Sequence, residues 1–166
     1  HEYSRIVMCG LTSVSVAVVD SGVHPNHPHV GSVAGGVGIA IDGAEHEDFV
    51  DRLGHGTAVA AAIREKAPRS VLYAVKVFDQ ELSTSVEALV AAIDWAVGAR
   101  VRLINLSLGM VNTEHENQLR TAVERAASSG TLIVAPAADA KKQWLPGSLP
   151  GVVPVALDWN CPRDQF

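Results

Sequence analysis

Short apolar segments alternate with helical patterns along this chain, and that alternation restricts its fold more than any other feature. The apolar segments are rich in β-branched residues and have the length of buried strands; they cover residues 13–19, 71–77, 101–106, 132–135 and 152–157. Helical spacing marks 55–66, 85–97 and 114–128. This order predicts right-handed crossovers and an α/β fold of three layers, with helices on both faces of a mostly parallel central sheet. Pro154 places the last strand at a sheet edge.

Length and composition exclude several classes of protein. With 166 residues, 48% hydrophobic and 19% charged, the chain fits one globular domain over residues 1–166. Its formal net charge of -5 argues against nucleic acid or an anionic membrane as a partner, because such surfaces need clustered Lys and Arg. No apolar run approaches the ~18 residues of a transmembrane helix. The oligomeric state stays open.

Two cysteines, Cys9 and Cys161, stand near the two ends and define no disulfide framework. We expect free thiols, because disulfides are rare in the cytosol. Together with the lack of a visible signal peptide, this slightly favours the cytoplasm. The glycine-rich stretch 31–38 lacks the GxGxxG spacing and opens no helix, so it does not indicate a nucleotide site. No cofactor is expected.

Asp20 and His55 are the two residues whose setting indicates chemistry. Asp20 ends the first apolar segment, where a buried carboxylate is costly without a partner. His55 opens the first helix between Gly54 and Gly56, which lets the backbone approach closely and leaves the imidazole open to a cleft. Such a pair can be the orienting acid and the base of a catalytic triad. The alternative is a turn-forming Asp and a structural His.

Five segments in a fixed order resemble the subtilisin-like serine peptidases. Residues 16–23 (VAVVDSGV) resemble the aspartate motif of that family, and residues 54–60 (GHGTAVA) its histidine motif. Residues 72–77 (LYAVKV) are similar to the strand that follows in the family, and residues 104–109 (INLSLG) to the strand and loop that bind substrate backbone. Residues 146–155 (PGSLPGVVPV) are similar to the segment after the oxyanion loop. The resemblance covers about residues 13–157. It implies a subtilisin-like fold, incomplete at its C-terminal end, and peptide-bond hydrolysis.

The resemblance also implies roles for individual residues. Asp20 would orient the imidazole, and His55 would act as general base and then as general acid. A polypeptide substrate would pair main chain to main chain, as an added strand. The residues implied for that groove are Ser107, Leu108 and Gly109 on one side and Leu82, Ser83 and Thr84 on the other.

The nucleophile of the family stands in a Gly-Thr-Ser-type motif at the start of a later helix, and nothing similar occurs before Phe166. Ser107 and Ser148 lie near site segments but lack that turn-to-helix setting. We therefore expect the serine beyond residue 166, in a processing protease for a specific protein or leader peptide. The alternative is a catalytically inactive pseudoprotease that keeps the peptide-binding groove.

Histidines and lysines outside these motifs suggest further functional hypotheses. His24, His27 and His29 suggest a metal-dependent hydrolase, but their spacing and two intervening prolines favour a solvated loop, so no metal is expected. Many subtilisins bind calcium at a loop inserted after the histidine helix. Here the next strand is expected at about residue 70, directly after that helix, so this loop is absent. Lys141 and Lys142 are expected to be a solvated surface pair. The alternative places them at the rim of a pocket that favours an acidic substrate residue.

Asp139 stands where the family usually has the asparagine that donates a hydrogen bond to the oxyanion. An ionised carboxylate cannot donate, so Asp139 would have to be protonated to take that role. Low solvation or a second negative charge would favour the protonated form. The alternative is a solvated loop residue, with a backbone amide as the oxyanion donor.

If Asp139 is the donor, the activity of the full protein should fall as pH rises, because the ionised form cannot donate. Asp139→Asn should keep or increase activity and remove this fall, since an amide donates at every pH. Asp139→Ala should cost about 10²–10³ in turnover, the size of the effect in subtilisin. We would measure pH–rate profiles of wild type and both variants; an alanine variant as fast as wild type would contradict the role.

Overall fold

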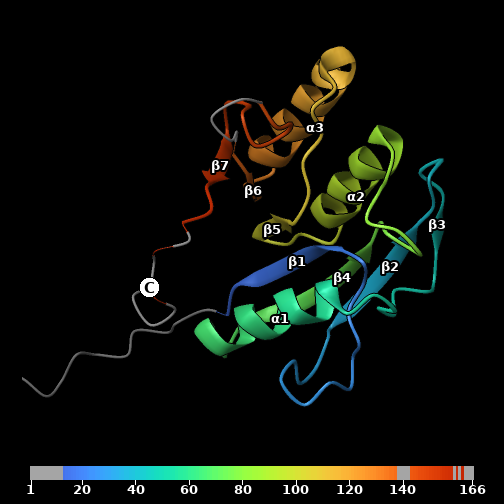
Figure 1. Ribbon diagram of the computed structural model, residues 1–166, viewed down its shortest axis with the longest axis vertical. Coiled ribbons are helices and arrows are strands. Elements are labelled where there is room, and N and C mark those ends of the chain that lie inside the picture. Colours follow the sequence, from blue (N-terminus) through green and yellow to red (C-terminus); the bar gives the residue numbers. More distant parts are fainter. Residues whose placement is uncertain (1–12, 138–142, 159, 161, 163–166) are drawn as a thin grey trace, which may run out of the picture.

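The computed structural model describes residues 13–137, 143–158, 160 and 162. The described residues form a seven-stranded sheet in the order β3-β2-β4-β1-β5-β6-β7 (Figure 1). Its strands are β1 (Ser15–Asp20), β2 (Gly35–Ile39), β3 (Glu45–His46), β4 (Val71–Lys76), β5 (Leu103–Leu106), β6 (Leu132–Pro136) and β7 (Val152–Val155). Only the short β3 is antiparallel to its neighbour. The predicted α/β fold with a mostly parallel sheet is therefore confirmed.

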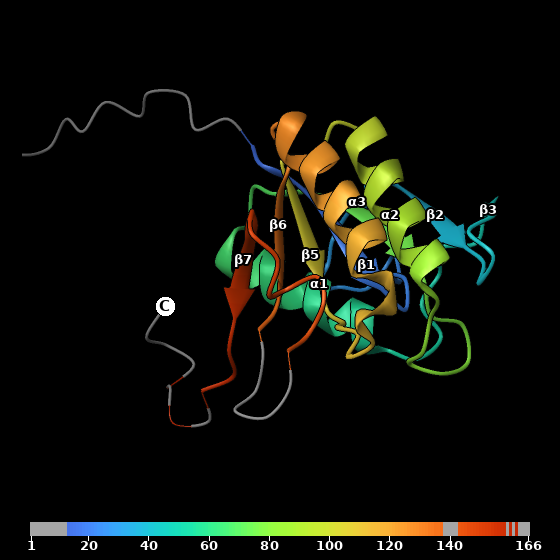
Figure 2. The ribbon, with the colours of Figure 1, turned by 90° about the horizontal axis from the view of Figure 1, so that it is seen from above.

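Helices cover both faces of this sheet. They are α1 (His55–Lys66), α2 (Val86–Gly98) and α3 (Glu116–Ser128), the last preceded by a 3₁₀ turn, η1 (Thr113–His115). Ala17 and Val19 of β1 belong to the core under α2 and α3, whereas Val16 and Val18 belong to the core under α1. Figure 2 shows α1 on one side of the sheet and α2 with α3 on the other. A strand that is buried on both faces reads as a continuous apolar run, which is why β1 was visible in the sequence.

The structure corrects several of the predicted elements; for example, α3 begins at Glu116 rather than at residue 114, and β5 begins at Leu103 rather than at residue 101. Strands β2 and β3 were missed, because β2 has the sequence GGVGI and glycine is depleted in strands. Pairing of β2 with β4 overrides that local preference. The predicted helix 85–97 is α2, whose N-cap is Ser85, with its hydroxyl accepting from the Ala88 amide at 2.9 Å.

The predicted edge position of the last strand is confirmed. Among the described residues, β7 pairs only with β6 and ends the sheet order. Pro154 therefore sits where a missing N–H interrupts no second ladder. In the part of the chain that the structure describes, no helix is both long and apolar enough to span a bilayer.

The core makes a direct stability prediction. Leu89 of α2 is fully buried, so Leu89→Ala should lower the free energy of unfolding by about 2–5 kcal/mol through lost transfer energy and a cavity. Ile41, which is 73% exposed, provides the control, and Ile41→Ala should change the free energy of unfolding by about 0.5 kcal/mol or less. Urea unfolding of both variants gives the comparison, and equal losses would show that α2 does not pack as described.

Candidate active site

Asp20 lies at the carboxyl end of β1, in the middle of the sheet. Because β4 and β5 flank β1 and run parallel to it, the loops after these two strands lie on either side of Asp20. Ligands of open α/β sheets bind at this edge. The Asp20 side chain is fully buried, and its Oδ1 accepts from the Ser21 amide at 2.7 Å. A buried carboxylate needs such donors.

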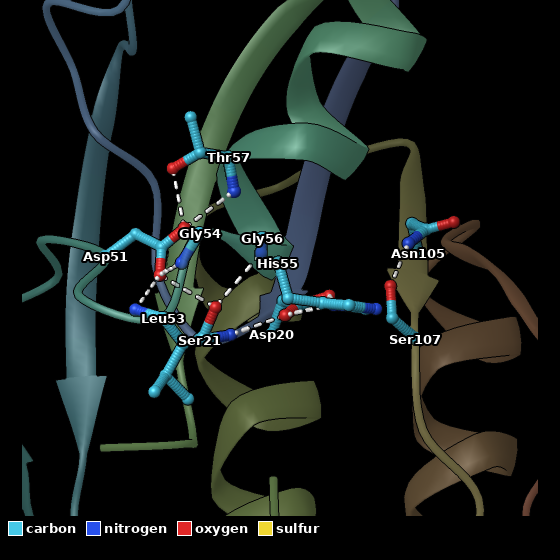
Figure 3. Close-up of polar contacts among 10 residues, drawn as sticks. All are labelled: Asp20, Ser21, Asp51, Leu53, Gly54, His55, Gly56, Thr57, Asn105 and Ser107. Carbon is cyan, nitrogen blue, oxygen red and sulfur yellow. Dashed lines mark hydrogen bonds and ion pairs between the residues drawn. The ribbon is translucent and has the colours of Figure 1, made fainter. Parts of the chain in front are cut away.

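His55, the first residue of α1, provides the second partner. Its Nδ1 lies 2.8 Å from Oδ1 and 2.9 Å from Oδ2 of Asp20 (Figure 3). The contact predicted from the sequence is therefore confirmed. The His55 side chain is 46% exposed, and no described residue hydrogen-bonds its Nε2. In Figure 3 the ring extends past Asp20 toward the side where Ser107 follows β5.

This geometry determines which nitrogen can act as a base. Asp20 as a carboxylate only accepts hydrogen bonds, so the His55 Nδ1 that faces it must carry a proton. In the neutral ring Nε2 then holds the free lone pair, directed away from Asp20. The pair can take up a proton at Nε2, and the Asp20 carboxylate stabilises the resulting imidazolium.

The two glycines beside His55 serve different purposes. A Cβ on Gly56 would collide with the Gly22 carbonyl oxygen and lie 3.0 Å from the Asp20 Cβ, so here the backbones do approach closely. Gly54 has open space around it, but its φ of 86° lies in the left-handed region. Close approach therefore explains Gly56, whereas backbone conformation explains Gly54.

The segments predicted to bind substrate follow the two strands that flank β1. Leu82, Ser83 and Thr84 follow β4, and Leu82 and Ser83 are exposed. Ser107, Leu108 and Gly109 follow β5 and are half-buried. No described residue hydrogen-bonds the main chain of Leu108 or Gly109. Both segments thus follow strands that end at the same edge of the sheet as Asp20. Ser83 and Thr84 line a hollow there with Ile39, Ala40 and Ile41 of and after β2. The role of both segments in binding stays a prediction.

Neighbouring side chains shape the ends of these segments. The Ser107 hydroxyl accepts a hydrogen bond from the side-chain amide (Nδ2) of Asn105 at 3.0 Å. A Cβ on Gly109 would collide with the ring of Trp144, and the next residue, Met110, forms a two-bond bridge with Leu145. The loop after β5 is therefore held by the segment that precedes β7.

A second buried carboxylate beside the site was missed in the sequence. Asp51 precedes His55 by four residues and is 8% exposed. Burial alone would raise its pKa, but hydrogen bonds from Thr57, Gly54 and Ser21 outweigh that effect and hold the pKa below its usual value. Its position just before a helix start was the only signal available, and Asp48 in the same loop shares it.

Lys76 is a buried cation at the end of β4. Its Nζ lies 2.9 Å from Asp79 and 3.4 Å from Asp48. The hydrogen bond from Arg52, at 2.6 Å, is the main reason that the pKa of Asp48 falls to about 2. The hydrogen bond from Lys76 likewise lowers the pKa of Asp79. These groups keep acidic side chains ionised beside the loop 79–84.

Other predicted features have different outcomes. Asp139, Lys141, Lys142, Cys9 and Cys161 lie outside the described residues. The rings of His27 and His29 lie 5.6 Å apart, but no group of three or more His, Cys, Asp or Glu side chains suited to a metal ion occurs in the described part of the chain. Helix α1 ends at Lys66 and β4 begins at Val71, so the connection there is short.

Comparison with known proteins now identifies the family. The model of the subtilase family matches residues 12–156. The chain belongs to the subtilase family. A thermostable alkaline protease of Halalkalibacterium halodurans is 35% identical over 163 residues, which cover 91% of this chain and 43% of that protein. Subtilisin of Bacillus pumilus is 36% identical over 135 residues, 76% of this chain and 47% of that protein.

A solved structure supports the same placement of this subtilase. The crystal structure of a lanthipeptide protease matches with a TM-score of 0.71 and 27% identity, over 86% of this chain and 47% of that one. The chain thus spans less than half the length of each of these three proteins. The family resemblance inferred from the five segments is confirmed.

The contact between α1 and β1 can be tested at its closest point. Gly56→Ala forces a Cβ against the Gly22 carbonyl, so it should lower the free energy of unfolding by about 1–3 kcal/mol, as overpacking does. Gly98→Ala, at the end of α2, is the matched control, because a Cβ added there would meet no atom of another part of the chain within 4 Å. Because alanine favours helix, it should leave stability unchanged or raise it by up to about 1 kcal/mol. Thermal unfolding that ranks the two variants equally would contradict the close approach.

Proposed function

We propose that the full protein is a serine endopeptidase in which Asp20 and His55 are two members of a Ser-His-Asp triad. The observation that supports this most strongly is that both Asp20 carboxylate oxygens bond His55 Nδ1, at the carboxyl end of the middle strand of a subtilase sheet. In this proposal the nucleophilic serine belongs to a part of the protein outside these 166 residues. Within the described residues, the Ser21 and Ser107 hydroxyls already bond to protein groups.

The proposed reaction uses the free face of the imidazole twice. His55 Nε2 takes the proton of the serine hydroxyl as the serine oxygen bonds to the peptide carbonyl carbon. The imidazolium, stabilised by Asp20, then gives that proton to the leaving amine as the C–N bond breaks. Water attacks the acyl-enzyme by the same route: its proton passes to Nε2 and returns to the serine oxygen, which releases the carboxylic acid.

The proposed substrate is an extended polypeptide that lies between the two loops flanking Asp20. Residues 107–109 and 82–84 would each pair with its main chain, as strands added to a sheet edge do. The main chain of Leu108 and Gly109 supports this, because none of the described residues hydrogen-bonds it and such groups need a partner when substrate excludes water. Asp139 would complete the oxyanion site in the protonated form.

For the substrate class, we propose a specific precursor protein, such as one that carries a leader peptide. The support is the similarity to a lanthipeptide protease of known structure, at 27% identity. A processing enzyme that recognises few substrates needs a groove with defined side-chain contacts rather than an open surface. The partner would thus be a polypeptide, and the proposal includes no cofactor.

Covalent labelling of the full-length protein tests the proposed chemistry. A serine-directed fluorophosphonate should label the wild type, and the label should map outside residues 1–166. His55→Ala should abolish labelling and lower turnover by about 10⁶, the loss that subtilisin shows, because no base remains. His29→Ala, in an exposed loop, is the matched control and should label normally.

Two results would contradict this proposal. A wild-type protein of verified mass that takes no label would favour the inactive, peptide-binding pseudoprotease. A His55→Ala variant with unchanged turnover would remove His55 from the mechanism, whatever the labelling result.

A further inference from the structure

Asp51 makes more hydrogen bonds than its place in a loop would suggest. It does not touch the His55 ring, yet both of its carboxylate oxygens are saturated by donors (Figure 3). Oδ1 accepts at 2.9 Å from each of the Ser21 hydroxyl, the Leu53 amide and the Gly54 amide. Oδ2 accepts from the amide of Thr57 at 2.9 Å and from its hydroxyl at 2.6 Å.

Ser21 extends this set of bonds to the residue after His55. Its hydroxyl donates to Asp51 and accepts from the Gly56 amide at 3.0 Å. Ser21 also follows Asp20 directly in the chain, so one hydroxyl links the end of β1 to the start of α1. The amides of Gly54 and Gly56, on both sides of His55, are therefore tied to Asp51, the first directly and the second through Ser21.

These bonds replace the usual cap of helix α1. The first amides of a helix lack partners within it, and an N-cap side chain normally accepts from one of them. Here the N-cap is Gly54, which has no side chain, so Asp51 and Ser21 accept instead. A carboxylate at this end also interacts favourably with the helix dipole. The lowered pKa of Asp51 agrees with a charge that is stabilised in place.

We propose that Asp51 is the positioning residue that fixes His55 for catalysis, through the first turn of α1. This inference rests on the proposed peptidase function. His55 stands between two glycines, the residues with the greatest backbone freedom, so its ring contact with Asp20 does not by itself determine where the backbone lies. The bonds from Asp51 remove that freedom. The groove loops after β4 and β5 do not contribute to them.

The chemistry requires a carboxylate at this position. All five groups that face the two Asp51 oxygens are donors. An amide of the same shape would direct its own NH₂ at some of these donors. At Oδ2 it would face Thr57, whose hydroxyl already accepts from the His24 amide at 3.0 Å. Asp51→Asn therefore removes acceptors without removing volume, which makes it the sharpest variant.

We would compare Asp51→Asn with wild type in the full-length protein. A misplacement of about 1 Å can cost about 10²-fold, so we expect kcat to fall about 10²-fold while KM stays within about twofold. The matched control is Asp48→Asn, in the same loop, whose carboxylate bonds Arg52 and Lys76 rather than α1. It should leave kcat unchanged, and Lys76 keeps Asp79 as its partner.

A second readout does not depend on turnover. The proton on His55 Nδ1, held by Asp20, should give a protected, downfield NMR resonance in wild type. In Asp51→Asn this resonance should broaden or disappear, because the ring is no longer held in one position. If wild-type protein showed the resonance but no peptidase activity, the proposed function would fail while the positioning role would still be tested.

Milder variants guard against a loss of folding. Thr57→Val keeps the shape but loses the hydroxyl donor to Asp51, and Ser21→Ala loses the link to Gly56. Each should lower kcat and broaden the Nδ1 proton resonance, and Thr57→Ser should restore what Thr57→Val loses. If these folded variants and Asp51→Asn keep the wild-type kcat and resonance, or change only KM, the positioning role is wrong.

Discussion

The buried carboxylate of Asp20 is the constraint on which the rest of this site depends. A fully buried carboxylate costs several kcal/mol unless donors replace its water. The donors here are the Ser21 amide and His55 Nδ1, one from its own chain neighbour and one from α1. The end of β1 therefore cannot be buried unless α1 begins beside it. The burial of Asp20 and the position of α1 therefore depend on each other.

Two carboxylates divide the work of holding the histidine. Asp20 faces the ring and meets a nitrogen that can change its charge. Asp51 faces the backbone and meets donors that cannot. Each is adjacent to Ser21, the first in sequence and the second through a hydrogen bond. The ring and the backbone of His55 are thus fixed by separate groups, which leaves the free nitrogen in a defined direction.

Much of the fold and the central pair of the site could be predicted from the sequence, for identifiable reasons. Strands β1 and β4 to β6 gave apolar runs because helices cover most of the sheet, and Asp20 and His55 stood out against those runs. Strand β2 gave no such signal, because its glycines rely on pairing with β4. Asp51 could not be found either, because Asp48 has the same local setting and only the folded chain brings five donors to Asp51 alone.

The acidic neighbours of Lys76 explain why its ammonium group does not pair with Asp20. The two residues are direct partners in the register of β1 and β4, where an ammonium group could pair with the carboxylate. In the described structure the Lys76 ammonium instead lies against Asp79 and Asp48. An ammonium on Asp20 would offset the negative charge that stabilises an imidazolium at His55. Asp79 and Asp48 therefore give the Lys76 ammonium partners of its own, and His55 is the side chain that pairs with Asp20.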